Sequence, residues 1–187
     1  MKVIGVIGQN GSGKDEVLKY LRAKYNMPFL STGDMVRDIA VKEGKESTRE
    51  NLQEISERYF QEFGKGIFVK MVAENMQQNG WSIGGITGIR SLDDVKILRN
   101  SFGKDCILIN VYVSNPEVRY RRMLKRGEDR DPHSYEQFLR QDTVEEELFH
   151  IQSAAQYANY SIGNDGSLDE LYREIDRLVT EKKLPVH

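Results

Sequence analysis

The sequence is poor in the residues that build disulfide frameworks and metal centres. Among its 187 residues there are one cysteine, Cys106, and three histidines. One cysteine excludes a disulfide within the chain and is typical of a reducing compartment, so we expect a cytoplasmic protein. Cys106 lies in an apolar run, which predicts a buried core residue. The histidines lack metal-ligand spacing and do not predict a metal centre.

Long apolar runs and an excess of charge of one sign are also missing. The apolar stretch over residues 1–8 is too short for a signal peptide or a membrane span. The 27 Lys and Arg residues nearly balance the 29 Asp and Glu residues, which leaves a formal net charge of −2. We therefore expect neither nucleic acid nor membrane as a partner. Any bound anion must be met by locally placed basic side chains.

Short apolar runs alternate with longer helical patterns along the chain. This alternation predicts an α/β fold of three layers, α/β/α, with a parallel sheet of about five strands. The predicted strands are 3–7, 28–30, 81–86, 106–113 and 160–162. Capping-box spacing marks three helix starts, at Ser47/Glu50, Ser134/Gln137 and Ser167/Glu170.

A glycine-rich loop ending in lysine joins the first predicted strand to a predicted helix. Glycines let backbone N–H groups curl around an anion, and the helix adds the positive end of its dipole. Lys14 supplies a full charge to β- and γ-phosphates. This context predicts a P-loop (Walker A) site that binds ATP as phosphoryl donor. The residues predicted to bind it are Gly8, Gln9, Asn10, Gly11, Ser12, Gly13, Lys14 and Asp15.

Asp15 departs from the motif, which has Ser or Thr after the lysine to ligate Mg²⁺. A carboxylate is also a hard-oxygen ligand for Mg²⁺. In this respect the loop resembles those of some deoxynucleoside monophosphate kinases and phosphomevalonate kinases, which also carry aspartate there.

Two further stretches resemble the acceptor region of adenylate kinases. In the first, residues 31–37, the resemblance implies that Thr32 and Gly33 lie near the acceptor base and that Arg37 grips the acceptor phosphate. In the second, residues 87–90, it implies a second phosphate-binding arginine, Arg90. A guanidinium fork suits a dianionic phosphate well.

Thr87 stands where that family has the aspartate that orients Mg²⁺ and its waters. Asp15 and Thr87 close neighbouring predicted strands at the carboxyl edge of the sheet, so both should face the same metal. We expect the two metal-site roles to be exchanged, with one carboxylate and one hydroxyl retained. The alternative is that metal binding is weakened and catalysis is poor.

A basic segment follows the fourth predicted strand. Arg119, Arg122 and Arg126 have the spacing i, i+3 and i+7, which places them on one helical face, and Arg130 follows in a charged loop. The segment resembles the lid of small kinases, which implies that Arg122 and Arg126 stabilise the transferring phosphoryl group. The alternative is a solvated charged helix.

The segment from 159 to 168 is similar to the last strand and turn of dephospho-CoA kinases. That resemblance implies that residues 164–166, beginning with Asn164, lie by the donor adenine. An ordinary turn capped by Ser167 is the alternative. Residues 48–53, with Arg58 and residues 63–64, resemble deoxynucleoside monophosphate kinases and favour a (deoxy)nucleotide acceptor.

Taken over nearly the whole chain, the sequence is similar to a family of small P-loop proteins related to adenylate kinase and dephospho-CoA kinase. This implies one kinase domain over residues 1–187, with a core at 1–35 and 80–187, a helical acceptor-binding insertion at about 36–79 and a short lid at about 120–135. The expected activity is Mg²⁺-dependent transfer of the γ-phosphate of ATP to a small-molecule acceptor, a nucleoside or deoxynucleoside monophosphate. The alternatives are dephospho-CoA or phosphomevalonate as acceptor, or a nucleotide-binding regulator or slow ATPase.

Overall fold

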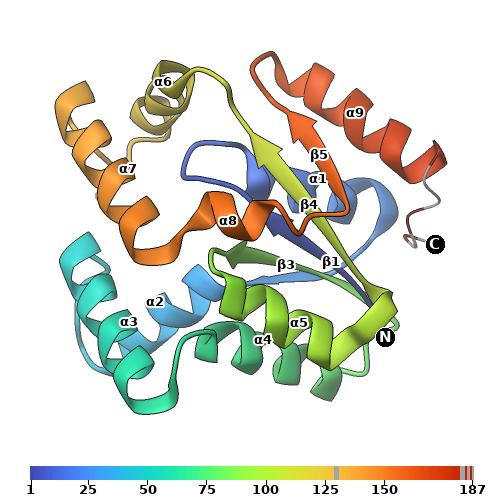
Figure 1. The fold of residues 1–187 in the computed structure, drawn as a ribbon, viewed down its shortest axis with the longest axis horizontal. Helices are drawn as coiled ribbons and strands as arrows, with labels where there is room; N and C mark the ends of the chain where they lie inside the picture. Colours follow the sequence, from blue (N-terminus) through green and yellow to red (C-terminus); the bar gives the residue numbers. More distant parts are fainter. Residues whose placement is uncertain (129–130, 182–183, 185, 187) are drawn as a thin grey trace.

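The computed structural model describes residues 1–128, 131–181, 184 and 186. These residues form a five-stranded parallel sheet with the order β2-β3-β1-β4-β5 (Figure 1). The strands are β1 (Lys2–Ile7), β2 (Phe29–Ser31), β3 (Ile83–Ile89), β4 (Cys106–Tyr112) and β5 (Tyr160–Gly163). The predicted parallel sheet of about five strands is confirmed. Because β1 is the central strand, the glycine-rich loop after it lies at the middle of the carboxyl edge.

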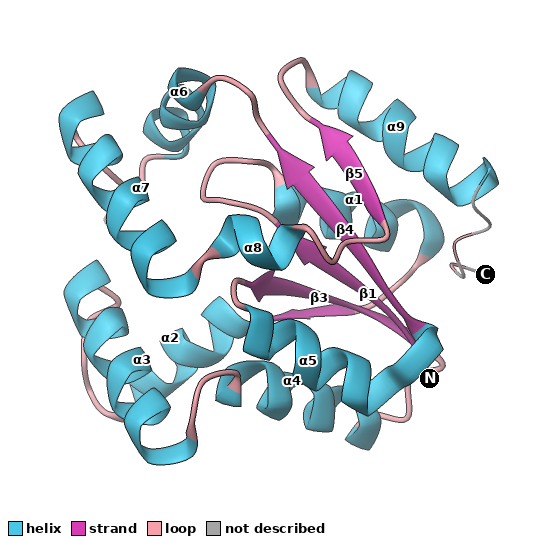
Figure 2. Cartoon of the chain, viewed as in Figure 1, coloured by secondary structure: helices cyan, strands magenta, loops and turns pink. Residues whose placement is uncertain are grey.

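Helices cover both faces of the sheet, which gives the predicted three layers (Figure 2). One face packs against α1 (Lys14–Tyr25) and α9 (Leu168–Glu181), in an apolar cluster that includes Ile4, Leu18 and Ile175. The other face packs against α4 (Ile67–Gln78), α5 (Leu92–Phe102) and α8 (Ile151–Ala155). Cys106 is buried in this second cluster, as predicted. In the described part of the chain, no helix combines the length and apolar character needed to cross a bilayer.

The remaining helices lie beside the carboxyl edge. Helices α2 (Thr32–Lys42) and α3 (Arg49–Phe63) pack on α4 through a smaller apolar cluster around Ile55 and Phe68. After β4 come α6 (Pro116–Arg126) and α7 (Tyr135–Phe149), and a short 3-10 turn, η1 (Gly103–Asp105), precedes β4. In Figure 1, α3 and α7 stand on the same side of the molecule, beyond the strand ends.

The helix starts largely follow the capping pattern. Ser134 accepts the N–H of Gln137, and Ser167 accepts the N–H of Glu170. The predicted start at Ser47 is wrong by one residue: the N-cap of α3 is Thr48, whose hydroxyl accepts the N–H of Asn51. Serine and threonine are adjacent there, and either hydroxyl can cap a helix.

A bulge at the end of β3 sets the direction of the chain toward Arg90. Val6 pairs with Thr87 and Ile7 pairs with Ile89, so Gly88 has no partner residue on β1. Gly88 has a φ of 87°, in the region that favours glycine. Its carbonyl accepts a 3.0 Å hydrogen bond from Thr32 Oγ1, and a Cβ on Gly88 would overlap that oxygen. The bulge thus connects β3 to the first turn of α2.

Substitution of Gly88 by alanine should destabilise the fold more than the same substitution at Gly80. Both glycines have positive φ, but a Cβ on Gly80 would meet nothing within 4 Å. We expect Gly80→Ala to lower the free energy of unfolding by about 1 kcal/mol, and Gly88→Ala by roughly 2 kcal/mol more, from the added overlap. Urea unfolding measures both, and equal losses would contradict the role of the Thr32 contact.

An ion pair with a buried guanidinium fastens α7 to α6 and to the glycine-rich loop. Arg119, 2% exposed, donates from Nη1 and Nη2 to the two carboxylate oxygens of Asp142, each at 2.6 Å. The same guanidinium donates to the backbone oxygen of Asn10 at 3.3 Å and lies over the ring of Phe138. A bidentate pair of this kind fixes both position and orientation. The loop after β1 therefore rests on α6 and α7.

Neutralising Asp142 should cost much of the stability of the protein. Asp142→Asn leaves the buried guanidinium of Arg119 without a counter-charge, and we expect a loss of about 3 kcal/mol. The matched control is Glu136→Gln on the same helix, which breaks an exposed pair with Arg140 and should change stability by less than about 0.5 kcal/mol. Chemical denaturation of the two variants would contradict this reading if their losses were alike.

Candidate active site

The glycine-rich loop has the backbone shape of an anion cradle. Gly11 and Gly13 have φ values of 76° and 93°, and Gly13 is the N-cap of α1. A Cβ on Gly11 would lie 2.7 Å from the backbone oxygen of Arg119, so the loop and α6 approach too closely for any side chain there. The N–H groups of the loop therefore lie at the N-terminus of α1. This is the positive end of the helix dipole, where anions bind favourably.

Lys14 lies at the first turn of α1 and is 8% exposed. Burial lowers the pKa of its ammonium, and the charge of Asp15, whose Oδ2 is 3.9 Å from Nζ, opposes that shift. The positive charges of Arg90 and Arg126 lower this pKa further, and the negative charge of Glu145 raises it. A partly desolvated ammonium gains strongly from an anionic ligand.

Asp15 and Thr87 meet, as the sequence led us to expect. Thr87 Oγ1 donates to Asp15 Oδ1 at 2.7 Å. Burial alone would raise the pKa of Asp15, but the charge of Lys14 and the hydrogen bond from Thr87 outweigh it and leave this pKa below its usual value. Asp15 is therefore ionised at neutral pH.

The oxygen donors at this position suit Mg²⁺ held jointly with a nucleotide. Among the described residues, no group of three His, Cys, Asp or Glu side chains is placed to bind a metal. Mg²⁺ commonly takes one or two protein oxygens and completes its shell with substrate phosphates and water. The carboxylate of Asp15 and the hydroxyl of Thr87 fit that pattern, so these two residues are the candidates to hold the ion.

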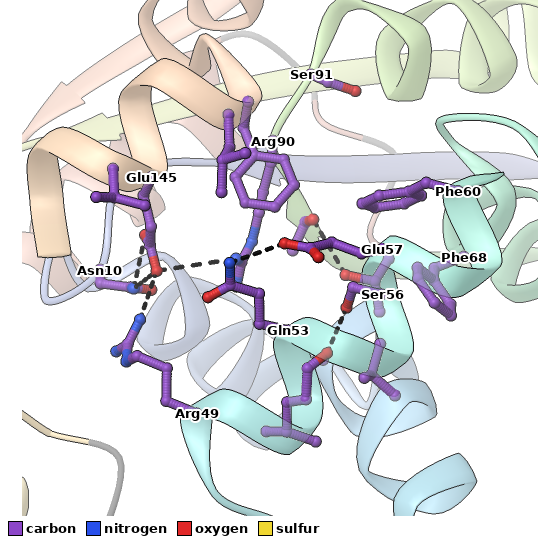
Figure 3. A pocket seen from close by; sticks show the side chains of 18 of the residues that line it. Asn10, Arg49, Gln53, Ser56, Glu57, Phe60, Phe68, Arg90, Ser91 and Glu145 are labelled. Atoms are coloured by element: carbon purple, nitrogen blue, oxygen red, sulfur yellow. Dashed lines mark hydrogen bonds and ion pairs between the residues drawn. The ribbon is translucent and has the colours of Figure 1, made fainter.

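A cavity of about 880 Å³ opens beside the loop. Its wall includes all four residues predicted to bind the acceptor: Thr32, Gly33, Arg37 and Arg90. Aromatic side chains, among them Phe60 and Phe68, form one side, and Asn10, Arg49 and Glu145 gather on the other (Figure 3). The cavity thus combines an apolar wall with a charged end next to the glycine-rich loop, which is the usual composition of a small-molecule site.

The two predicted acceptor arginines are held differently. Arg37 forms an ion pair with Asp34, one turn earlier on α2. Arg90 lies over the ring of Phe149, with its guanidinium carbon 5.2 Å from the ring centroid. Asp94 fixes the backbone beneath it, because its Oδ2 accepts the N–H groups of Arg90 and Ser91, each at 2.9 Å.

Glu145 was not singled out from the sequence, and Arg49 entered only as part of residues 48–53, without a role of its own. The structure places both at the charged end of the cavity (Figure 3). Asn10 Nδ2 donates to Glu145 Oε1 at 2.7 Å and to Oε2 at 2.8 Å, and Arg49 Nη1 donates to Oε1 at 2.8 Å. Arg90 Nη1 is 4.0 Å from the same Oε1. Burial raises the pKa of Glu145, but Arg90 and Arg49 outweigh that effect and lower it below its usual value.

The two predicted lid arginines occupy different places. Arg126 lines the cavity and pairs with Asp131. Arg122 instead donates to the backbone oxygens of Asn164 and Gly166, at 2.8 and 2.9 Å, and burial lowers its pKa. Residues 129 and 130 of the predicted lid lie outside the described residues.

Asn164 has its side chain against the glycine-rich loop. It is 4% exposed, and its Nδ2 donates to the backbone oxygen of Ser12 at 2.8 Å. A Cβ on Gly13 would overlap this amide. The loop after β5 therefore supports the glycine-rich loop through the side chain of Asn164 and not through its own backbone.

The sequence is similar to a family model over most of the chain and to individual proteins over almost all of it. The AAA domain family matches residues 7–138. A UPF0200 protein of Thermococcus kodakarensis is 34% identical over 181 residues, which are 96% of this chain and 97% of that protein. Another, of Thermococcus onnurineus, is 36% identical over 188 residues, which are 99% of this chain and 100% of the other.

Solved structures of small kinases share the fold. A shikimate kinase from Acinetobacter baumannii in complex with shikimate has a TM-score of 0.61 at 18% identity, over 98% of this chain and 96% of that one. A sugar kinase from Janibacter has a TM-score of 0.62 at 17% identity, over 100% and 98%. A gluconokinase from Sinorhizobium meliloti has a TM-score of 0.58 at 16% identity, over 100% and 98%. The predicted relationship to small kinase-like P-loop proteins is thereby confirmed, and the chain belongs to the AAA domain family and to the UPF0200 proteins.

Proposed function

We propose that this protein is an ATP-dependent phosphotransferase whose acceptor is a nucleoside or deoxynucleoside monophosphate. The observation that carries the proposal is that the glycine-rich loop, which leads to Lys14, contributes Asn10 to the wall of a cavity that also bears Arg37 and Arg90. Donor phosphates on the loop and an acceptor phosphate on the arginines would lie next to each other. Phosphoryl transfer needs this positioning more than it needs covalent chemistry from the protein.

Each group has a defined task in this mechanism. The loop N–H groups and Lys14 hold the β- and γ-phosphates of ATP, and the apolar side of the cavity receives the acceptor base beside Thr32 and Gly33. Arg37 and Arg90 hold the acceptor phosphate, whose oxygen attacks the γ-phosphorus as the bond to the ADP oxygen breaks. Arg126, at the cavity wall, stabilises the charge that develops on the transferred group. Asp15 and Thr87 would hold Mg²⁺, which would supply positive charge to the phosphates of the nucleotide.

The size and apolar wall of the cavity support an acceptor as large as a nucleotide. A volume of about 880 Å³ lies within the range of small-molecule sites, and Phe60 and Phe68 offer flat surfaces to a base. The structural neighbours include kinases named for shikimate and gluconate. Those two compounds therefore belong in any panel of acceptors, beside dephospho-CoA and phosphomevalonate.

ADP release from Mg-ATP should rise strongly with one nucleoside monophosphate in such a panel. Loss of a charge-assisted hydrogen bond to the acceptor phosphate should lower kcat/KM by roughly 10- to 150-fold in Arg37→Ala and in Arg90→Ala. The control is Arg177→Ala on α9, an exposed arginine paired with Glu174, which should leave the rate unchanged. A flat response across the panel with ATP still bound would reject the kinase and favour a nucleotide-binding regulator or slow ATPase.

The proposed exchange of metal-site roles between Asp15 and Thr87 can be tested by swapping the two side chains. Asp15→Ser and Thr87→Asp should each weaken Mg-ATP binding, because the first removes the only carboxylate of the pair and the second sets two carboxylates against each other. The double variant, which restores one carboxylate and one hydroxyl, should recover most of the affinity. A double-mutant cycle with calorimetric Mg-ATP binding measures the coupling, and additive losses without recovery would reject the exchange.

A further inference from the structure

The carboxylate of Glu145 occupies a place in the cavity wall where an anionic ligand could bind. This carboxylate accepts hydrogen bonds from the side-chain amide of Asn10, on the glycine-rich loop, and from the guanidinium of Arg49, on α3. It also faces Arg90, just after β3 (Figure 3). These three residues come from separate parts of the chain and converge on one pair of oxygens. Glu145 itself comes from a fourth element, α7.

The donors around this carboxylate are the kind that bind a phosphate group. Two guanidinium groups and a neutral side-chain amide surround this carboxylate, and guanidinium groups match phosphate oxygens as well as they match carboxylate oxygens. All four residues line the cavity, although Glu145 is only 9% exposed. The carboxylate is ionised, since Arg90 and Arg49 hold its pKa below the usual value despite burial.

A phosphate dianion and the ionised Glu145 cannot share these partners, because two anions at hydrogen-bond distance from the same guanidinium groups repel each other strongly in a buried site. When phosphate binds, the carboxylate of Glu145 must therefore leave these donors. Asp142, one turn before Glu145, is bound to Arg119 and holds α7 in place, so the inference requires a change in the side-chain rotamer of Glu145 rather than a movement of the helix.

We propose that Glu145 is an internal stand-in for the acceptor phosphate, and that Asn10, Arg49 and Arg90 form the site which the acceptor phosphate takes over by displacing it. The inference rests on the proposed function for the identity of the acceptor group, and it adds Arg49 and Asn10 to the acceptor site. It also makes Glu145 a residue that sets specificity. An acceptor without an anionic group cannot replace the carboxylate on these partners, and neither can water. The carboxylate therefore occupies these donors until the correct acceptor arrives.

Removing the charge of Glu145 should strengthen phosphate binding. The probe is inorganic phosphate, titrated calorimetrically into protein saturated with a non-hydrolysable ATP analogue, which keeps phosphate out of the glycine-rich loop. We expect Glu145→Gln and Glu145→Ala to lower the Kd for phosphate by about tenfold. Glu147→Gln is the matched control, because Glu147 is exposed on the same helix and its loss changes the net charge by the same amount.

Several outcomes would count against the inference. Unchanged or weaker phosphate binding in both Glu145 variants would overturn it, and so would failure of both to fold, because a residue that the acceptor displaces cannot be essential to the fold. If acetate gained affinity and phosphate did not, the assignment to phosphate would be wrong. Binding needs no turnover: tighter phosphate binding without transfer to any acceptor would reject the proposed function alone. Transfer with unchanged phosphate affinity would reject this inference alone.

Discussion

The positive charge of Lys14 lies where little water reaches it, at the first turn of α1 and 8% exposed. An ammonium in such a place is costly unless anions compensate it. Within the protein Asp15 is close to it, at 3.9 Å, and Asp15 also accepts the hydrogen bond from Thr87. The N-terminus of α1 and the backbone N–H groups of the loop add positive potential beside this ammonium, so this part of the site favours an anionic ligand.

The glycine-rich loop is held from several directions, and Asn10 is central to this support. Its backbone oxygen accepts a hydrogen bond from Arg119, and its side-chain amide donates a hydrogen bond to Glu145. On the far side, Asn164 donates to Ser12, and Arg122 holds the turn that carries Asn164. These contacts link the glycine-rich loop to α6, α7 and the segment after β5. The same loop also contributes Asn10 to the wall of the cavity.

The sequence predicted the features that depend on neighbouring residues. The strand, loop and helix around Lys14 follow from glycine spacing and apolar runs. Asp15 meets Thr87 because Asp15 follows the loop that leaves β1 and Thr87 lies near the carboxyl end of the neighbouring strand β3. Glu145 could not be found in this way. Glu145 and Asn10 are 135 positions apart, and no local pattern distinguishes Glu145 from the glutamates beside it. Arg122 and Arg126 show the same limit: one helical face predicts a shared direction, but packing sends one to the turn after β5 and the other to the cavity.

The central claim is that a donor triphosphate and an acceptor phosphate lie end to end between Lys14 and the cavity arginines. The most direct measurement is the calorimetric affinity for a bisubstrate nucleotide in which two nucleosides are joined through five phosphates. If the two sites adjoin, one molecule spans both. It should then bind with 1:1 stoichiometry at least about 100-fold more tightly than ATP, and it should exclude both ATP and the acceptor. An affinity no greater than that of ATP, with the acceptor still able to bind, would contradict the account.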